Sequence, residues 1–385
     1  MFGKALPFVP PATLFISSCF LDFLYRSIVI RLAIYTTITA VACLAIISPP
    51  FNNALLNYLT GFFSFWYIIW SANILFIYRP LQLRRLKRHG SPAEIAYRWE
   101  GLPPPYTHRR FQWAWDLSTN YRGIGWEHTM PTDGYPPLKT HGVVKDKDFS
   151  PRIPLICRQV RRIVVSYILL DLAQNVLHMS WRNSLDWARA IAEIIATGLA
   201  LFGFTDGLHA LATLIGVGLL GGEEWMYPAL FGRLEYFKQM RIKDIWGRVW
   251  HDLFRSGFLS LSQAIAPKGP AVLLVCFILS GLLHAAASYS ASRDTTATMW
   301  VFFFFCAQPM GVILQAYIDA SVKGIAGEPK SSPIVPMVRR FLVFLAGVVF
   351  VYHTFPWACR DPGLREAING APLPWSLARL LLASF

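Results

Sequence analysis

One histidine lies in the middle of a long apolar stretch, where an ionisable side chain is costly and is therefore a functional candidate. His284 stands between Phe277–Leu283 and Ala285–Ala287, in a segment without Lys, Arg, Asp or Glu. Such surroundings favour the neutral imidazole, which can accept a proton. The small residues on both sides would let a neighbouring helix or a substrate approach closely. His284 is a candidate general base, although a histidine that only packs against another helix fits this position equally well.

A second candidate cluster, Trp246–Asp252, combines two tryptophans, an arginine and a histidine in a short amphipathic stretch. Trp246 and Trp250 could form an aromatic wall for a substrate, and His251 could contact the reacting groups. The same composition also suits an interfacial anchor, because indole rings favour the headgroup region. From this stretch alone, the anchor is the better interpretation. The preceding acidic and aromatic segment, Glu223–Gly232, is interpreted as a structured turn that leads into it.

Several chemistries lack their sequence motifs. The chain contains no HExxH zinc pair, no histidine boxes of a di-iron oxygenase, no P-loop and no GxSxG nucleophile elbow. It also lacks a pair of aspartate-rich motifs that could hold a diphosphate through magnesium, which disfavours a prenyltransferase. The sequence therefore predicts no metal site.

The elements that must position these residues are membrane helices. The chain is 54% hydrophobic and only 15% charged, with a mean hydropathy of +0.40, which is too apolar for a soluble protein of this length. A spanning helix needs about 20 mostly apolar residues. We expect an all-α, polytopic membrane helix bundle of seven to nine spans. The clearest candidates are Ile30–Ser48, Leu59–Tyr78, Ile163–Ser180, Ala188–Phe204, Ala271–Tyr289, Met299–Ala320 and Phe341–Phe355, and the shorter ones are Pro11–Leu24, Leu208–Leu220 and Trp375–Phe385.

The formal charge of +14 is spread unevenly along the chain. Arg79–Arg162 contains 16 Lys and Arg against 7 Asp and Glu, a net +9, and many of these charges lie near its membrane ends. Cytoplasmic loops carry such an excess, so this loop and Gly221–Lys268 are both predicted to be cytoplasmic. Leu208–Leu220 must then re-enter the membrane or not cross it. Basic flanks are common in membrane proteins, so no nucleic-acid partner is predicted.

The charge distribution divides the chain into three parts. Residues 1–78 are predicted to be N-terminal membrane spans, 79–162 a cytoplasmic or interfacial loop, and 163–385 a catalytic membrane domain. The first apolar stretch has no basic n-region and no convincing cleavage site, so a retained anchor is expected.

Four short motifs in a fixed order resemble those of the wax synthase-like acyltransferases. They are Asn120–Trp126, Glu224–Trp225 with Pro228–Gly232, Trp246–His251 and Ser280–His284. The sequence is most similar to the fungal branch that acetylates hydroxyl groups of terpenoids and meroterpenoids, a relative of the membrane-bound O-acyltransferases. The resemblance covers most of Arg79–Pro356. Each motif is permissive, but four in the same order with plausible spacing rarely arise by chance.

The resemblance implies roles for the candidate residues. His284 matches the catalytic intramembrane histidine, and Trp246–His251 matches a tryptophan-rich motif whose last position is commonly Asn or His. Val249 stands where the family often has a second arginine, so an anion-binding role rests on Arg248. The resemblance also implies acetyl-CoA or another acyl-CoA as co-substrate, no bound cofactor, a hydroxylated terpenoid or other lipophilic alcohol as acceptor, and residence in the bilayer of the endoplasmic reticulum.

The expected mechanism is direct acyl transfer, with His284 as general base and His251 as a polar contact for the thioester or the base. Trp246 and Trp250 would line the substrate path. The family also contains long-chain wax and sterol ester synthases, so acyl length stays open. Two other hypotheses are a transporter with a histidine-lined path and a membrane cyclase. The cyclase would need intramembrane acids, for which the best placed residues are Asp171, Glu193 and Asp319.

Overall fold

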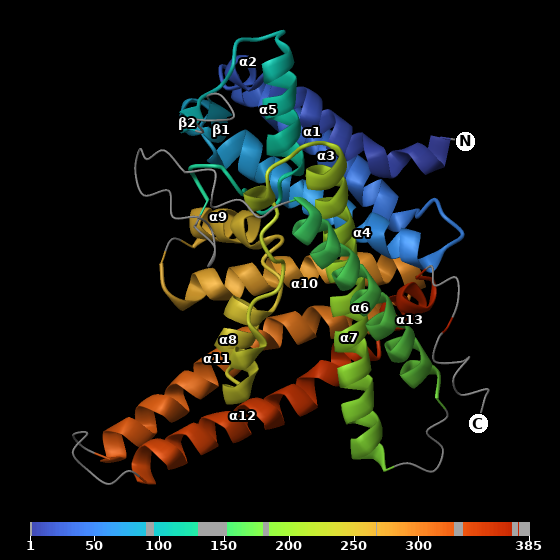
Figure 1. Ribbon diagram of the computed structural model, residues 1–385, viewed down its shortest axis with the longest axis vertical. Helices are drawn as coiled ribbons and strands as arrows, with labels where there is room; N and C mark the ends of the chain where they lie inside the picture. Colours follow the sequence, from blue (N-terminus) through green and yellow to red (C-terminus); the bar gives the residue numbers. More distant parts are fainter. Residues whose placement is uncertain are drawn as a thin grey trace.

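The computed structural model describes residues 2–89, 96–129, 152–179, 185–266, 268–326, 334–371 and 376 (Figure 1). These residues are mostly helical and include one two-stranded antiparallel sheet. In chain order, with η for 3-10 and π-helical segments, the elements are η1 (Phe2–Phe8), α1 (Val9–Cys19), α2 (Leu21–Leu24), α3 (Ile28–Ile47), α4 (Ala54–Ala72), η2 (Asn73–Ile77), η3 (Pro80–Gln82), β1 (Arg85–His89), β2 (Ala96–Glu100), α5 (His108–Thr119), α6 (Arg152–His178), α7 (Asp186–Thr213), η5 (Leu214–Leu219), η6 (Glu224–Met226), η7 (Leu234–Gln239), α8 (Ile242–Asp244), η8 (Ile245–Val249), α9 (Arg255–Ile265), α10 (Pro270–Ser292), α11 (Thr295–Ala326), α12 (Ile334–Cys359) and α13 (Pro362–Asn369).

Six helices within the described ranges are long and apolar enough to cross a membrane. The predicted all-α polytopic bundle is confirmed, and the predicted seven to nine spans slightly exceed this number. The six segments are Ile28–Ile47, Ala54–Ile77, Asp186–Leu219, Pro270–Ser292, Thr295–Val322 and Pro336–Cys359.

The difference in span number has local causes. Pro11–Leu24 forms two short helices, α1 and α2, and Trp375–Phe385 lies outside the described residues except for Ser376. The described part of the expected span Ile163–Ser180 lies in α6, which ends at His178 and also carries Arg161, Arg162 and Asp171, and this helix is not among the six.

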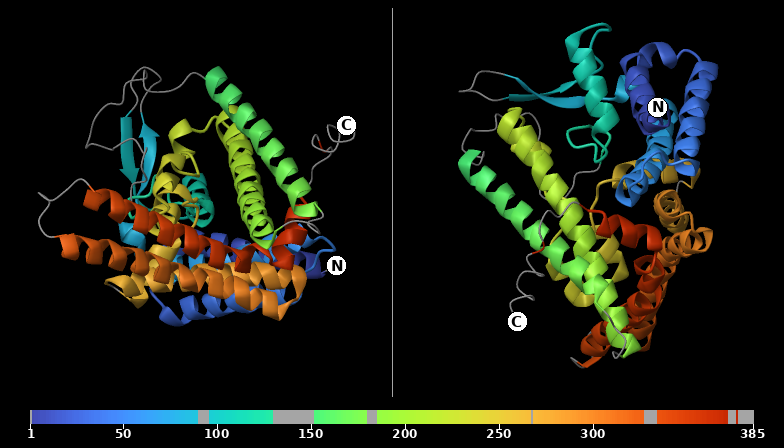
Figure 2. Two further views of the ribbon diagram at one scale, coloured as in Figure 1. Left: turned by 90° about the horizontal axis from the view of Figure 1, so that it is seen from below. Right: turned by 90° about the vertical axis from the view of Figure 1, so that its right-hand side faces the viewer.

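Leu208–Leu220 does not form a separate re-entrant segment. It continues α7 into η5, so Asp186–Leu219 is one continuous helical segment of 34 residues. Helices α6 and α7 pack closely as a hairpin (Figures 1 and 2). The two ends of this hairpin lie together, so Gly221–Lys268 begins near the start of α6 (Figure 1). The expected topology therefore stays a prediction: it requires α6 to cross the membrane beside α7, and it needs no re-entrant loop.

Helix α10, which carries His284, packs against α4 on one side and α11 on the other. Close approach to α4 depends on Gly61, because a Cβ atom there would lie 2.3 Å from the carbonyl oxygen of Ala286. On the opposite side, a Cβ at Gly281 would lie 3.1 Å from the carbonyl oxygen of Phe302. The small residues near His284 therefore admit both neighbouring helices, as their pattern predicted.

Polar side chains cap several helix starts. Ser27 and Asn53 accept hydrogen bonds from the backbone amides of Ile30 and Leu56, at the beginnings of α3 and α4. Asp361 accepts a hydrogen bond from the backbone amide of Leu364 at 2.9 Å, which starts α13. These contacts satisfy amides that have no partner inside the helix.

The loop after η2 is anchored to the membrane helices by tryptophans. Trp113 and Trp126 are 0% and 3% exposed and join a core with Trp66 and Trp70 of α4. The indole Nε1 of Trp70 donates to the carbonyl oxygen of Leu117 in α5 at 3.0 Å. These two side chains therefore extend the hydrophobic core.

Candidate active site

Seven aromatic side chains, here called the aromatic cluster, form a closed series of contacts that contains both candidate histidines. They come from α4, from the segment Ile245–Phe254, from α10 and from α11. The distances between ring centroids are 5.3 Å for His251–Trp250, 6.0 Å for Trp250–Trp246, 5.9 Å for Trp246–Phe305, 4.4 Å for Phe305–His284, 5.3 Å for His284–Phe62, 5.2 Å for Phe62–Phe254 and 6.4 Å for Phe254–His251.

His284 lies between α4 and α11. Its imidazole stacks on Phe305 with an interplanar angle of 9° and meets Phe62 edge-on. The side chain is only partly buried, although the helix around it is packed on two sides. These apolar neighbours hold the orientation of the ring while part of it stays accessible, an arrangement that suits a base acting on a bound substrate.

His251 lies on the opposite side of the aromatic cluster, in the turn after η8. The Nδ1 atom of its ring is buried and has no hydrogen-bond partner among the described residues. Burial, with a smaller contribution from the Arg122 guanidinium, lowers the pKa of His251 to about 4. The ring is therefore neutral at pH 7. It can bind a polar substrate atom without adding a positive charge to the site.

Trp246 is fixed by a hydrogen bond that the sequence analysis missed. Its indole Nε1 donates to Oε1 of Gln308 at 3.0 Å, and Gln308 in α11 is fully buried. The segment is further tied to α11 by Gln315, whose Oε1 accepts from the backbone amide of Ile242 at 2.7 Å. Both glutamines are lone polar residues in an apolar span, which could have marked them as candidates.

The tryptophan-rich motif adopts a π-helical turn, η8. The backbone amide of Trp250 donates to the carbonyl oxygen of Ile245 at 2.8 Å, which is the i to i−5 spacing of a π-helix. Within this turn, Trp246 and Trp250 both reach the aromatic cluster, with ring centroids 6.0 Å apart. The two rings are therefore placed side by side, and their role as an aromatic wall for a substrate stays a prediction.

Arg248 does not join the two histidines. Its side chain is 54% exposed, and its Nε lies 3.4 Å from a carboxylate oxygen of Asp244. The guanidinium also lies 5.0 Å from the ring centroid of Tyr236. Arg248 is thus on the outside of the turn that carries Trp246, where it can meet an anion from solution but not the reacting atoms.

The four sequence motifs meet around His251 and His284. Arg122 of the first motif contacts the backbone of Pro228–Gly232 and the carboxylate of Asp252. Phe231 of the second motif packs edge-on against His251, with ring centroids 5.9 Å apart. The resemblance assigned no role to any residue of the first two motifs, Asn120–Trp126 and Glu224–Gly232. The structure places Arg122 and Phe231 of these motifs beside the tryptophan-rich motif.

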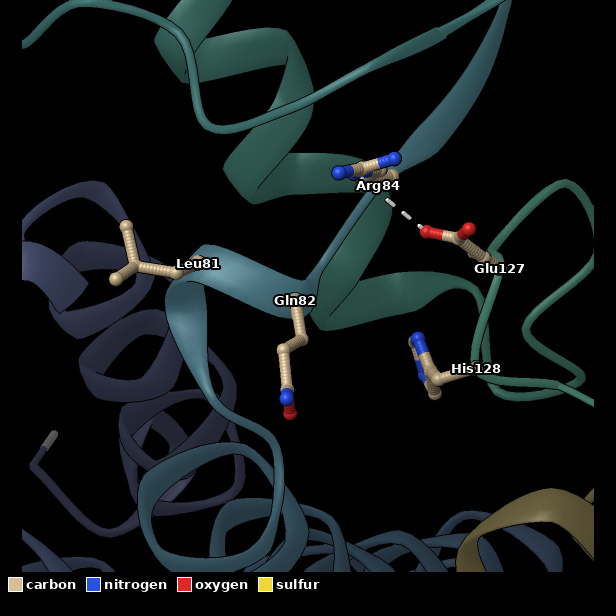
Figure 3. Close-up of a pocket in the computed structure, with 5 residues that line it drawn as sticks. All are labelled: Leu81, Gln82, Arg84, Glu127 and His128. Atoms are coloured by element: carbon tan, nitrogen blue, oxygen red, sulfur yellow. Dashed lines mark ion pairs between the residues drawn. The ribbon is translucent and has the colours of Figure 1, made fainter.

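A pocket outside the aromatic cluster is lined by Leu81, Gln82, Arg84, Glu127 and His128 (Figure 3). Nε of Arg84 lies 3.7 Å from Oε2 of Glu127, and burial lowers the pKa of His128 to about 4. None of the site residues predicted from the sequence lines this pocket. Neither His251 nor His284 therefore lines this pocket.

The carboxylates that a cyclase would need are engaged elsewhere. Glu193 has arginine nitrogens from Arg189 and Arg365 at 3.0 Å and from Arg360 at 3.4 Å. Asp319 lies 3.0 Å from Nε of Arg339, and Asp171 accepts a hydrogen bond from Asn175. The aromatic cluster contains none of these acids. Within the described residues, no group of three or more His, Cys, Asp or Glu side chains is arranged to hold a metal ion.

Comparison with known families places both histidines in one matched segment. Residues 227–306, which contain Trp246, His251 and His284, match the membrane bound O-acyl transferase family. Within this segment the chain is similar to the membrane-bound O-acyltransferases. Proteins of that family use an acyl donor and an acceptor, and the six span-capable helices of this chain fit a lipid environment. A comparison with solved structures found no match.

Fungal proteins similar to this chain are named acetyltransferases or transferases. The acetyltransferase eriL of Hericium erinaceus is 24% identical over 71% of this chain and 72% of its own length. An acetyltransferase of Arthrobotrys oligospora is 25% identical over 66% of this chain and 59% of its own. The O-Mevalon transferase macI of Penicillium terrestre is 26% identical over 48% of this chain, and the match spans 47% of that protein.

Proposed function

We propose that this acyltransferase moves an acetyl group from acetyl-CoA to a hydroxyl group of a terpenoid or meroterpenoid, in the membrane of the endoplasmic reticulum. The observation that carries the proposal is the aromatic cluster, in which His284 and His251 lie among rings from three spans and the tryptophan-rich turn. The names of the fungal relatives support the acetyl donor.

In the proposed reaction, a ring nitrogen of His284 removes the proton of the acceptor hydroxyl as its oxygen attacks the thioester carbonyl. The new C–O bond forms and the C–S bond breaks, and the departing thiolate takes the proton from His284. The products are an ester and free CoA. Transfer within one ternary complex needs no acyl-enzyme.

His251 would stabilise the oxyanion that develops on the thioester carbonyl, or orient the thioester, through a ring N–H. A fixed donor in a water-poor site is effective because it needs no reorganisation during the reaction. Trp246 and Trp250 would form the wall of the acceptor site. Arg248, on the exposed side of the same turn, would attract the phosphates of CoA as they approach from solution.

The catalytic elements are proposed to lie in residues 163–385, and the other two parts of the chain complete the site. Phe62 of α4 contacts His284, and Arg122 contacts the turn before the tryptophan-rich motif. The proposal also explains why the site lies within the bilayer, since a charged donor from the cytoplasm and an apolar acceptor from the lipid can both reach it.

The test compares wild type, His284→Ala and a matched control, His353→Ala, in microsomes with equal amounts of protein. His353 also lies in a candidate span, but its side chain is exposed and contacts Tyr352 rather than the aromatic cluster. With labelled acetyl-CoA and a panel of hydroxylated terpenoids, we expect His284→Ala to lose at least about 100-fold of the ester formation. The His353→Ala variant should keep it.

The other outcomes identify the alternatives. Full activity of His284→Ala would make this residue a packing histidine. Ester formation only with long-chain acyl-CoA and fatty alcohols would indicate a wax or sterol ester synthase. If wild type transfers no acyl group from any donor, the proposal is wrong and a transporter becomes the leading hypothesis.

A further inference from the structure

The guanidinium of Arg122 connects two segments that lie far from it in the sequence. Its Nη1 donates to the carbonyl oxygen of Pro228 at 2.6 Å, and its Nη2 donates to that of Ala229 at 3.0 Å. The same Nη2 lies 2.7 Å and 3.0 Å from the two carboxylate oxygens of Asp252. The side chain is 7% exposed, so these contacts are shielded from water.

Both segments held by Arg122 touch His251. Asp252 follows His251 directly in the chain, and Phe231, two residues after Ala229, packs edge-on against the imidazole at 5.9 Å. The backbone amide of Gly232 then donates to the carbonyl oxygen of Val249 at 3.0 Å, which joins the two segments a second time. The imidazole of His251 therefore lies between two segments of the chain that the guanidinium of Arg122 holds together.

Arg122 is itself held in place by its neighbour Tyr121. The Tyr121 ring stacks on Phe254 with centroids 5.8 Å apart and an interplanar angle of 28°. The Tyr121 carbonyl oxygen accepts from the Ser256 hydroxyl at 2.8 Å, and its hydroxyl lies 2.7 Å from that of Tyr67 in α4. The arginine is thus anchored from a membrane span and is not a flexible surface residue.

Only an arginine can make this set of contacts. Its planar guanidinium presents several N–H donors in a fixed geometry, whereas the ammonium of lysine is a compact charge on a flexible stem. Arg122 binds three acceptors from two segments at once, namely the carbonyl oxygens of Pro228 and Ala229 and the carboxylate of Asp252. A lysine could reach only one or two of them.

We propose that Arg122 is a positioning residue of the active site, which holds His251 against the aromatic cluster by tying the Pro228–Gly232 turn to Asp252. The proposal rests on the proposed function, since it assigns Arg122 a role through His251. Arg122 does not touch the substrate. Its positive charge and the burial of the ring also keep His251 neutral, as its lowered pKa indicates.

The experiment measures kcat and KM for Arg122→Ala and Arg122→Lys, each in the wild-type and in the His251→Ala background. We expect Arg122→Ala to lower kcat by about 100-fold with KM for both substrates nearly unchanged, because only the geometry around the reacting atoms is lost. The Arg122→Lys variant should keep part of the rate. In the His251→Ala background, the loss of Arg122 should cost little more, because both changes remove the same contribution.

The matched control is Arg110, which makes the same kind of contacts in another place. It is 1% exposed, donates to the carbonyl oxygens of Cys19 and Pro103 at 3.0 Å and 2.9 Å, and pairs with Asp22. Arg110→Ala should destabilise the protein without changing kcat per folded molecule. Hydrogen exchange provides a readout that does not need activity, since peptides within 228–256 should exchange faster in Arg122→Ala than in Arg110→Ala.

Three results would overturn the proposal. Losses that multiply in the double variant would show that Arg122 acts independently of His251. A loss confined to KM for acetyl-CoA would make Arg122 a binding residue for the donor. Unchanged hydrogen exchange of residues 228–256 in both Arg122 variants would show that Arg122 does not hold the two segments together. If wild type forms no ester but hydrogen exchange of residues 228–256 still rises in Arg122→Ala, the proposed function is wrong. Arg122 would then still hold the two segments together.

Discussion

Two histidines with different surroundings define the chemistry at the scale of single residues. Both side chains are half-buried, but His284 stacks on Phe305, whereas the Nδ1 atom of His251 is buried and has no hydrogen-bond partner among the described residues. A base must reach the acceptor proton, and an oxyanion donor must keep an unoccupied polar atom for the thioester. The difference between their surroundings therefore supports the different roles that we propose for them.

His251→Asn should make the protein less sensitive to acid. The pKa of His251 is lowered to about 4, so between about pH 6.5 and 4 the unfolded chain binds a proton at this position and the folded protein does not. The free energy of unfolding therefore falls across this range by up to about 3 kcal/mol in wild type, and asparagine removes this contribution. Melting temperatures of both proteins in detergent, followed from pH 7.5 to about 4.5, should diverge in favour of the variant. Parallel curves would contradict the assignment.

At the scale of elements, the site depends on a close contact between two backbone segments. The Pro228–Gly232 turn crosses the π-helical turn η8 with so little space that a Cβ at Gly232 would lie 1.6 Å from the carbonyl oxygen of Arg248. Because this obstacle is backbone, it cannot rotate away as a side chain can. The turn and η8 therefore behave as one unit that carries Trp246, Trp250 and His251.

Gly232→Ala should separate these two segments. The added methyl group forces the backbones apart, which costs on the order of 1–3 kcal/mol and displaces the aromatic wall. We expect a lower yield of monodisperse protein in size-exclusion chromatography and strongly reduced ester formation. Gly198→Ala in α7 is the matched control, because a Cβ there meets nothing within 4 Å. Equal behaviour of the two variants would show that this contact does not hold the site.

At the scale of the whole molecule, the helical hairpins determine which segments face the same compartment. The α6–α7 hairpin starts at Arg152 and ends at Leu219, so the basic loop before it and the catalytic turn after it share one side of the membrane. The excess of Lys and Arg in both segments predicts that this side faces the cytoplasm. A CoA ester from the cytoplasm would reach the turn directly.

Glycosylation tags in microsomes test this topology. A tag inserted after Leu185, between α6 and α7, should be glycosylated, because this connection lies across the membrane from the turn. Tags inserted after Gly101 or after Lys238 should stay unmodified and accessible to added protease. Modification of the Lys238 tag would place the catalytic turn in the lumen and would contradict the proposed route of the donor.

The sequence by itself determined the membrane helices and the identity of the two histidines, because both are expressed in local composition. Hydropathy over about 20 residues predicts a span, and a lone histidine in such a span is conspicuous. The same local patterns singled out the tryptophan-rich stretch, but they did not predict its π-helical turn. Nor could they show that Leu208–Leu220 continues α7, since a short apolar segment is compatible with either structure.

Only the tertiary structure decided how the motifs meet. Arg122 lies 130 residues before Asp252, and Phe62 lies 222 residues before His284, yet each pair is in contact. No periodicity records such contacts, because they arise when helices from different parts of the chain pack together. For the same reason, only the structure shows that Gln308 and Gln315 of α11 accept hydrogen bonds from Trp246 and from the backbone amide of Ile242.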